Sequence, residues 1–200
     1  MTKENYDSDL LRTGEVSKHL KIFTSNEEFN LSSGGKLDYL NVAYETYGQL
    51  NKDKSNAVLI CHAVSGDSHV AQHDNTDLPG WWDIMVGPNR PIDTNKYFVI
   101  CSNVIGGCQG SIGPNSIDSN TGKEFGPNFP NITIEDMVSA QKLLIDSLEI
   151  EKLLSVTGGS MGGFQAIQWG RQYPEKVSGV IGFATSPRLT NQALAFDVVG

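Results

Sequence analysis

The stretch that most constrains the fold of this chain runs from Val156 to Gly163 and has the form Gly-x-Ser-x-Gly at Gly158, Ser160 and Gly162. An apolar run precedes it and a helix-like run follows it. Between a strand and a helix, this pattern places the serine on a sharp turn with its hydroxyl at the end of the sheet. Side chains at the two outer glycines would collide with the neighbouring strand and helix. We predict that Ser160 is a nucleophile; the alternative is a glycine-rich turn with an incidental serine.

Four short and nearly continuous apolar runs predict the strands of a sheet. Runs that are apolar on both faces suit parallel strands covered by helices on each side. Upstream of them, Lys21–Phe29 and Lys36–Tyr47 alternate around Gly34-Gly35, which predicts an antiparallel hairpin. The four runs are Ala57–Cys61, Tyr97–Cys101, Leu153–Val156 and Val177–Phe183.

Three helices are expected, and together with the strands they define an α/β protein. The first begins near Thr133, whose hydroxyl can cap the amide of Asp136, and ends near Leu148. The second covers Met161–Tyr173, and a third is expected over Asn191–Val199. Residues 64–96 and 105–132 form long connections rich in Gly, Pro and Asn, and loops of that length usually carry function. Residues 1–20 form a polar lead-in, and one domain accounts for residues 1–200.

Composition excludes several classes of function. The formal net charge of -8 argues against a nucleic-acid-binding surface, and no apolar run approaches the roughly 20 residues that span a bilayer. The polar N-terminus lacks the apolar core of a signal peptide. We expect reduced, packed thiols at Cys61, Cys101 and Cys108, as in a cytoplasmic protein. No metal is expected, because no Cys or His pair falls at a CxxC or HExxH spacing. His69 and His73 stand four apart and are a minor alternative as a ligand pair, since the stretch between them reads as a polar loop.

The strand Val58–Cys61 leads into a second candidate part of the site. In enzymes with a serine elbow, the loop after this strand supplies one oxyanion-hole amide and the residue after the nucleophile supplies the other. Here those would be the N–H groups of Val64 and Met161, with Gly66 letting the backbone turn close to a bound acyl oxygen. The alternative is that the loop is only a polar strand end.

Three stretches together resemble one family. They are the loop His62–Asp67, the block Gly106-Gly107-Cys108-Gln109-Gly110-Ser111-Ile112-Gly113-Pro114, and the elbow with its continuation to Ala166. In order and spacing they resemble the homoserine O-acetyltransferases of methionine biosynthesis, which are acyltransferases of the α/β-hydrolase fold. The likeness runs from about Leu37 to the end. Val64-Ser65 stands where the family commonly has Leu-Thr, and Ile112 where it often has Thr, which leaves acetyl and succinyl donors both open.

The resemblance implies a ping-pong reaction in a cytoplasmic homodimer. Ser160 would take the acetyl group of acetyl-CoA, a co-substrate rather than a bound cofactor, and pass it to the hydroxyl of L-homoserine. Triads of this fold follow the order Ser, acid, His, yet all four histidines (His19, His62, His69, His73) precede Ser160. His62 is expected to be structural. The resemblance therefore places the triad Asp and His, and the substrate-binding arginine, beyond Gly200, and makes residues 187–200 the start of the lid. We expect an inactive N-terminal portion of a longer enzyme, truncated before the lid and last strands.

Other functions and other residues stay open at this point. The same serine would serve an esterase, a deacetylase or a homoserine O-succinyltransferase, and a non-catalytic binding module is a further alternative. Trp81-Trp82 is expected to anchor its loop, and Asp67 either holds the oxyanion loop or is a solvated turn acid. Arg90 and Arg188 are candidates for binding the CoA phosphates.

Overall fold

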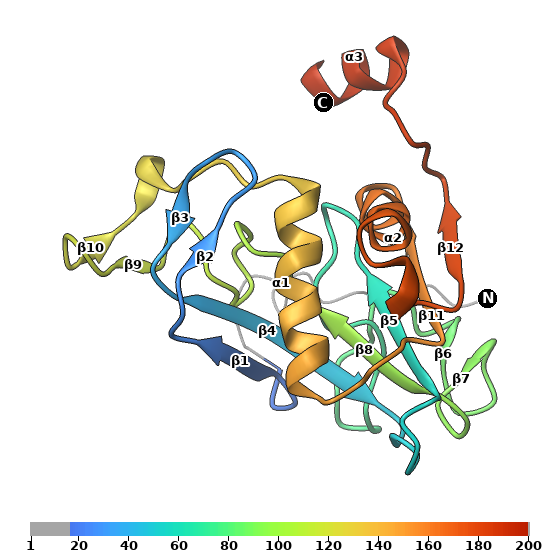
Figure 1. The fold of residues 1–200 in the computed structure, drawn as a ribbon. Coiled ribbons are helices and arrows are strands. Elements are labelled where there is room, and N and C mark those ends of the chain that lie inside the picture. The colour runs from blue at the N-terminus through green and yellow to red at the C-terminus, as the bar shows by residue number, and fades with distance from the viewer. Residues whose placement is uncertain (1–16, 200) are drawn as a thin grey trace.

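The computed structural model describes residues 17–199. Most of the predicted lead-in, residues 1–16, lies outside the described residues. The chain forms a six-stranded sheet with helices packed against it (Figure 1). Across the sheet the strand order is β1-β4-β8-β5-β11-β12. These strands span Lys21–Ser25 (β1), Leu40–Tyr47 (β4), Ala57–Cys61 (β5), Phe98–Ser102 (β8), Ser155–Gly159 (β11) and Val180–Phe183 (β12).

The four predicted strands are confirmed as parallel neighbours. β5 lies between β8 and β11, and β12 pairs with the outer side of β11, all in parallel. The predicted antiparallel pairing is also confirmed, because β1 pairs with β4, which continues antiparallel to β8. The turn region of that pair is more elaborate than expected, since β2 (Phe29–Asn30) and β3 (Lys36–Leu37) form a separate short hairpin. β11 begins two residues later than predicted and continues through its glycines to Gly159.

The three predicted helices are confirmed: α1 is Ile134–Ser147, α2 is Met161–Gln172 and α3 is Asn191–Val199. Thr133 caps α1 as expected, and the Thr133 amide donates in turn to the carboxylate of Asp136, which completes a capping box. Capping of this kind stabilises a helix by about 1 kcal/mol.

The two faces of the sheet are covered differently. α1 and α2 lie together on one face (Figure 1), where Leu144 and Trp169 of the helices belong to the same buried core cluster as Leu59 and Val156 of the sheet. The connection between β5 and β8 covers the other face, so within residues 17–199 the expected helices are seen on one face only. α3 stands away from the sheet at the end of an extended segment (Figure 1). The second face is filled by Tyr47, Val58, Ile60, Val70, Ala71, Val86, Val99 and Cys101.

The long connections contain little regular structure, as predicted. The first holds β6 (Val86–Gly87) and β7 (Ile92–Asp93), and the second holds β9 (Ile117–Asp118), β10 (Lys123–Glu124) and the 3-10 turn η1 (Gly126–Asn128). A second turn, η2 (Pro174–Lys176), links α2 to β12. The first connection starts directly after β5, so it brings its polar residues to the carboxyl edge of the sheet.

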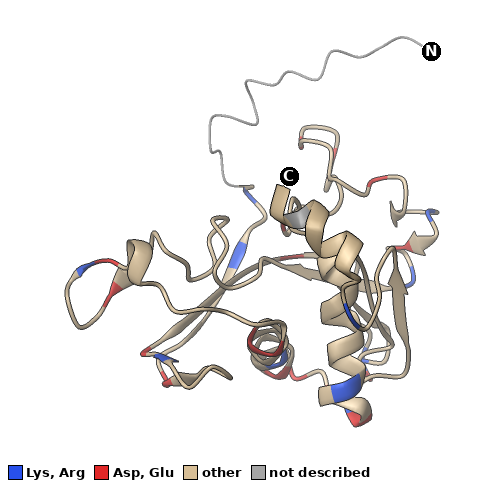
Figure 2. Cartoon of the chain, turned by 90° about the horizontal axis from the view of Figure 1, so that it is seen from above, with Lys and Arg blue, Asp and Glu red and all other residues tan. Residues whose placement is uncertain are grey.

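The structure also shows how the charged residues and the cysteines are distributed. Acidic and basic residues are interspersed along loops and helix surfaces (Figure 2), and no helix within residues 17–199 is both long and apolar enough to cross a membrane. Cys61 and Cys101 are buried free thiols, as predicted. Cys108 is free but exposed, which corrects the expectation that it is packed. It lies in a loop of glycines and polar residues that offers no apolar cover.

Candidate active site

Ser160 lies at the junction of β11 and α2 with a strained backbone. Its φ of 52° and ψ of -123° fall in a region that residues other than glycine rarely adopt. The turn is held from β12: the Ser160 amide donates to the Phe183 carbonyl at 3.2 Å, and the Thr185 hydroxyl donates to the Ser160 carbonyl at 3.1 Å. The serine side chain is exposed. Strand, strained turn and helix N-terminus are the arrangement predicted from the Gly-x-Ser-x-Gly pattern.

The glycines of the elbow permit a close approach between β5 and α2. A Cβ built on Gly162 would overlap the carbonyl of Cys61, and one on Gly158 would overlap the carbonyl of Gly162. Gly163 likewise leaves room for the side chain of Thr185. The helix therefore starts directly against the end of β5, which brings Ser160 beside the loop that follows that strand.

The two predicted oxyanion amides leave the sheet next to each other. Gly158 pairs with Cys61, so Val64 and Met161 each lie three residues beyond a matched pair on adjacent parallel strands. Neither N–H group donates to a residue within 17–199. The Val64 side chain is 80% exposed, so nothing at this position depends on its packing. Free backbone donors at this edge are what an oxyanion hole requires.

His62 fixes the start of the oxyanion loop. Its Nδ1 lies 2.7 Å from the Ala63 carbonyl, and its Nε2 accepts from the Val104 amide at 3.3 Å. This pattern requires a neutral ring with the proton on Nδ1. Burial lowers the pKa of His62, in spite of the hydrogen bond to Ala63. With both nitrogens occupied, His62 is structural, as expected, and is not free to act as the base for Ser160.

A buried chain of polar side chains ties the same loop to both helices. Gln165 Nε2 donates to the His62 carbonyl at 3.4 Å, and its Oε1 accepts from Gln141 at 2.7 Å. Gln141 in turn accepts from the indole of Trp169 at 2.8 Å. These three side chains are almost completely buried. The hydrogen bonds satisfy them and hold α1, α2 and the end of β5 in one register.

The glycine-rich block after β8 is fastened to β4. Asn103 donates through its Nδ2 to the Gln109 carbonyl, and its Oδ1 accepts from the Ser68 amide at 2.6 Å. The Ser111 hydroxyl donates to the Asn103 carbonyl and accepts from the Ala43 amide. All three stretches behind the family resemblance therefore follow neighbouring strands, β8, β5 and β11, at one edge of the sheet.

The remaining predicted residues hold the first long connection or lie on the surface. Asp67 accepts from the His69 amide at 2.8 Å, and its carbonyl accepts from the Trp81 indole at 2.9 Å, so Asp67 shapes the loop. Trp82 packs against the second core, as expected of a loop anchor, whereas Trp81 is 41% exposed and stacks on Trp82. Arg90 and Arg188 are exposed, on separate loops.

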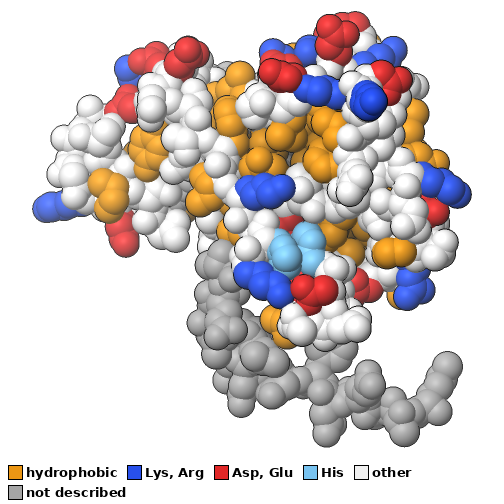
Figure 3. Space-filling view, turned by 90° about the horizontal axis from the view of Figure 1, so that it is seen from below, with side chains coloured by type: hydrophobic (Ala, Val, Ile, Leu, Met, Phe, Trp, Pro, Cys, Tyr) orange, Lys and Arg blue, Asp and Glu red, His pale blue; other side chains and the backbone are white. Residues whose placement is uncertain are grey.

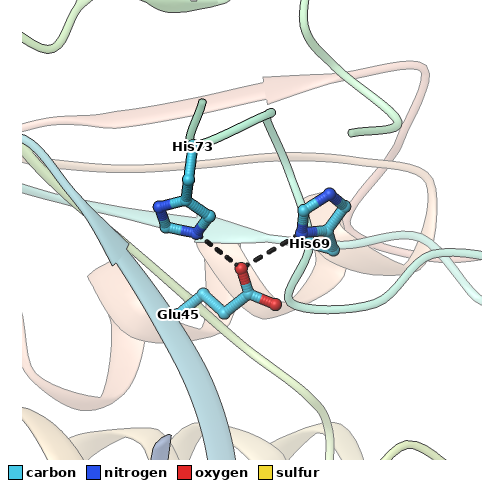
Figure 4. Close-up of side chains that lie close together, drawn as sticks. All are labelled: Glu45, His69 and His73. Atoms are coloured by element: carbon cyan, nitrogen blue, oxygen red, sulfur yellow. Dashed lines mark hydrogen bonds and ion pairs between the residues drawn. The ribbon is translucent and has the colours of Figure 1, made fainter. Parts of the chain in front are cut away.

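A cluster of Glu45, His69 and His73 lies on the second face of the sheet and was not expected from the sequence (Figure 4). Glu45 Oε2 lies 3.1 Å from His69 Nδ1 and 2.7 Å from His73 Nε2. Burial opposes charge on both partners, but the hydrogen bonds lower the pKa of Glu45 to about 2 and raise the pKa of His69 to about 9. A carboxylate facing inward from a buried strand is the signal that reveals such a cluster, because a buried charge needs a partner.

Comparison with known proteins places this architecture in a family. The family described as "alpha/beta hydrolase fold" matches residues 56–200. The chain belongs to that family, as the serine elbow and the parallel sheet indicate.

Within it, the relatives support the predicted resemblance. The chain is 55% identical to a homoserine O-acetyltransferase of Methanohalobium evestigatum over 90% of its own length, and it spans 37% of that relative. Among solved structures, it superposes on esterase E22 with a TM-score of 0.76 at 40% identity, covering 82% of this chain and 46% of the esterase. It superposes equally well, with a TM-score of 0.76 at 37% identity, on the homoserine O-acetyltransferase of Bacillus anthracis, covering 86% of this chain and 49% of that enzyme.

Proposed function

We propose that this chain is the part of a homoserine O-acetyltransferase that carries the nucleophile and the oxyanion hole. The observation that supports the proposal most is the strained elbow at Ser160, beside two backbone amides that donate to no residue within 17–199, in a chain 55% identical to such an enzyme. Acetyl-CoA is the donor and L-homoserine the acceptor. The triad acid and base and the substrate-binding arginine are assigned to the chain beyond Gly200, so residues 1–200 alone are expected to be inactive.

The proposed reaction has two transfers at one serine. Ser160 Oγ attacks the thioester carbonyl of acetyl-CoA, the carbon–sulfur bond breaks, and CoA leaves as the thiol with the proton that the serine gives up. The hydroxyl of homoserine then attacks the acetyl-serine and Ser160 regains a proton. In each step the carbonyl oxygen becomes negative, and the amides of Val64 and Met161 stabilise it.

An acyl-enzyme assay on the full-length native protein tests this proposal. Incubation with acetyl-CoA alone is expected to add one acetyl group to the protein and release one CoA thiol per site, and homoserine is expected to restart CoA release. A Ser160→Ala variant should lose the adduct, whereas Ser119→Ala, at an exposed serine, should retain it. A wild-type-like adduct in Ser160→Ala contradicts the assignment of the nucleophile.

Hydrolysis is the second candidate, and the likeness to esterase E22 favours it. In that case water rather than homoserine accepts the acetyl group at the same serine. CoA release at a rate independent of homoserine, with free acetate as the product, would identify the esterase.

Parallel assays with succinyl-CoA distinguish an O-succinyltransferase. Light scattering on the full-length protein tests the proposed homodimer, which we place in the cytoplasm.

A further inference from the structure

Three polar side chains from two separate parts of the chain converge on the second face of the sheet. Glu45 projects from β4, and its side chain is 1% exposed. His69 and His73 come from the connection after β5, and both rings point at the same carboxylate oxygen of Glu45 (Figure 4). The donor atoms of the three residues all lie within 4.8 Å of one another.

The hydrogen bonds around this cluster are of the kind that surround metal-binding side chains. His69 Nε2 lies 2.8 Å from the Leu78 carbonyl, which can only accept, so that nitrogen carries a proton and Nδ1 faces Glu45. The Tyr47 hydroxyl donates to Glu45 at 3.0 Å and orients the carboxylate. Metal-binding histidines typically donate their other N–H to a carbonyl in this way, and metal-binding carboxylates are themselves hydrogen-bonded.

A third histidine lies against this cluster. The ring of His19 stacks on His73 with a centroid separation of 3.9 Å. Its Nε2 is buried, yet within residues 17–199 it has no hydrogen-bond partner. Buried ring nitrogens are normally paired. Three of the four histidines of the chain thus gather at one place, and one of their nitrogens has no partner within residues 17–199.

We propose that Glu45, His69 and His73 bind a divalent transition-metal ion of the zinc type. Two imidazole nitrogens and one carboxylate oxygen suit zinc and its neighbours, whereas magnesium and calcium prefer oxygen ligands alone. The site is accessible, because the His69 and His73 side chains are 16% and 14% exposed. Imidazoles appear at the surface of this face beside acidic side chains (Figure 3). A solvent molecule can therefore complete the coordination.

Binding exchanges a proton for the metal. The proton that His69 Nδ1 donates to Glu45 leaves to solvent, and the proton that His73 Nε2 donates to the same oxygen leaves that nitrogen through solvent as well, so the lone pairs of both nitrogens turn to the ion. His69 keeps its Nε2 proton and its hydrogen bond to Leu78. The metal then links β4 to the connection that begins with the oxyanion loop. Its role is to hold that connection in place, and the site is independent of the proposed acyl transfer.

Zinc titration of the full-length native protein, prepared without a histidine tag and stripped with a chelator, tests the site. Calorimetry is expected to show one zinc bound per chain and a rise in melting temperature. Glu45→Gln and His73→Gln should each weaken zinc binding at least tenfold and lose the rise in melting temperature. Asp74→Asn, which removes an exposed carboxylate from the same connection, should behave like the wild type.

Two results would overturn the proposal. One is the absence of stoichiometric zinc uptake by the wild type. The other is uptake that Glu45→Gln and His73→Gln leave unchanged. Circular dichroism of the zinc-free variants shows whether they fold. If either does not, X-ray absorption of the zinc-loaded wild type decides: two imidazoles in the first coordination shell support the site, and a shell without histidine refutes it.

Discussion

A Cβ built on Gly162 would overlap the carbonyl oxygen of Cys61, because the first turn of α2 lies against the last residue of β5. The neighbour is backbone, and it belongs to a central strand, so it cannot move aside without disturbing the sheet. Gly162 is therefore required by packing, because its backbone is ordinary helix.

Gly162→Ala is expected to destabilise the protein by about 1–3 kcal/mol, the usual cost of overpacking a core. Gly179→Ala is the matched control, since the nearest atom to its new methyl would be the Leu154 carbonyl at 3.8 Å. That control should stay within about 0.5 kcal/mol of the wild type. Urea unfolding measures both, and equal midpoints for the two variants would show that the helix can shift away from β5.

Ser160 is expected to store backbone strain that glycine would relieve. Its φ of 52° costs a residue with a side chain about 1–3 kcal/mol. Ser160→Gly should therefore be more stable than Ser160→Ala, although both lack the hydroxyl. Because glycine also gains freedom in the unfolded chain, we expect a net difference of about 1 kcal/mol. Thermal unfolding of the two variants measures it, and equal melting temperatures would mean that the turn is unstrained.

The backbone amide of Val64 is expected to contribute to catalysis, whereas the Val64 side chain is not expected to contribute. Replacing the Val64 N–H by an ester oxygen, through incorporation of the α-hydroxy acid, should lower kcat for acyl transfer by about 10²–10³-fold. Val64→Ala keeps the amide and removes an 80% exposed side chain, so it should retain activity. Steady-state kinetics of the full-length protein compare them. A full-rate ester variant would remove Val64 from the oxyanion hole.

Because of His62, the free energy of unfolding is expected to decrease as the pH falls below neutral. Burial holds its pKa below the ordinary value of about 6.5. Below that pH the unfolded chain binds a proton that the folded chain resists, so stability is lost as pH falls, by at most about 1.4 kcal/mol per pH unit. His62→Asn removes this contribution.

Urea unfolding at several pH values isolates the effect of His62, because other groups titrate alike in both proteins. The wild type should be the more stable protein near neutral pH. The gap between it and His62→Asn should narrow as the pH falls through about 6.5, the ordinary pKa of the unfolded chain, toward the lower pKa of the folded protein. A gap that is constant with pH would mean that His62 titrates normally in the folded protein.

Local signals made much of this fold predictable. The cap at Thr133 and the end of α2 near Pro174 depend on a few adjacent residues, and both are confirmed. The elbow around Ser160 was equally readable, because its glycines lie next to the serine. The end of β11 was misplaced, since glycines are poor strand formers and the pairing with β5 and β12 extends the strand through them.

Features that depend on contacts between distant parts of the chain were not predicted. The cluster of Glu45, His69 and His73 depends on a loop folding back over β4, and no local pattern encodes that path. The sequence did contain a clue, since Glu45 lies two residues before the buried Tyr47 on one strand and therefore faces the same side of the sheet. Cys108 was misjudged for a similar reason: whether a loop thiol is covered depends on what the rest of the chain places above it.

The pairing of β11 with β5 also sets the order in which the molecule can assemble. Val156 lies opposite Leu59, a partner 97 positions earlier in the chain. Closing so long a loop carries an entropic cost before any contact repays it. A peptide covering only 153–173 has no β5 to restrain Ser160, so it should not adopt the strained turn. Among the described residues, we therefore expect the turn at Ser160 to form after the local pairing of β1 with β4.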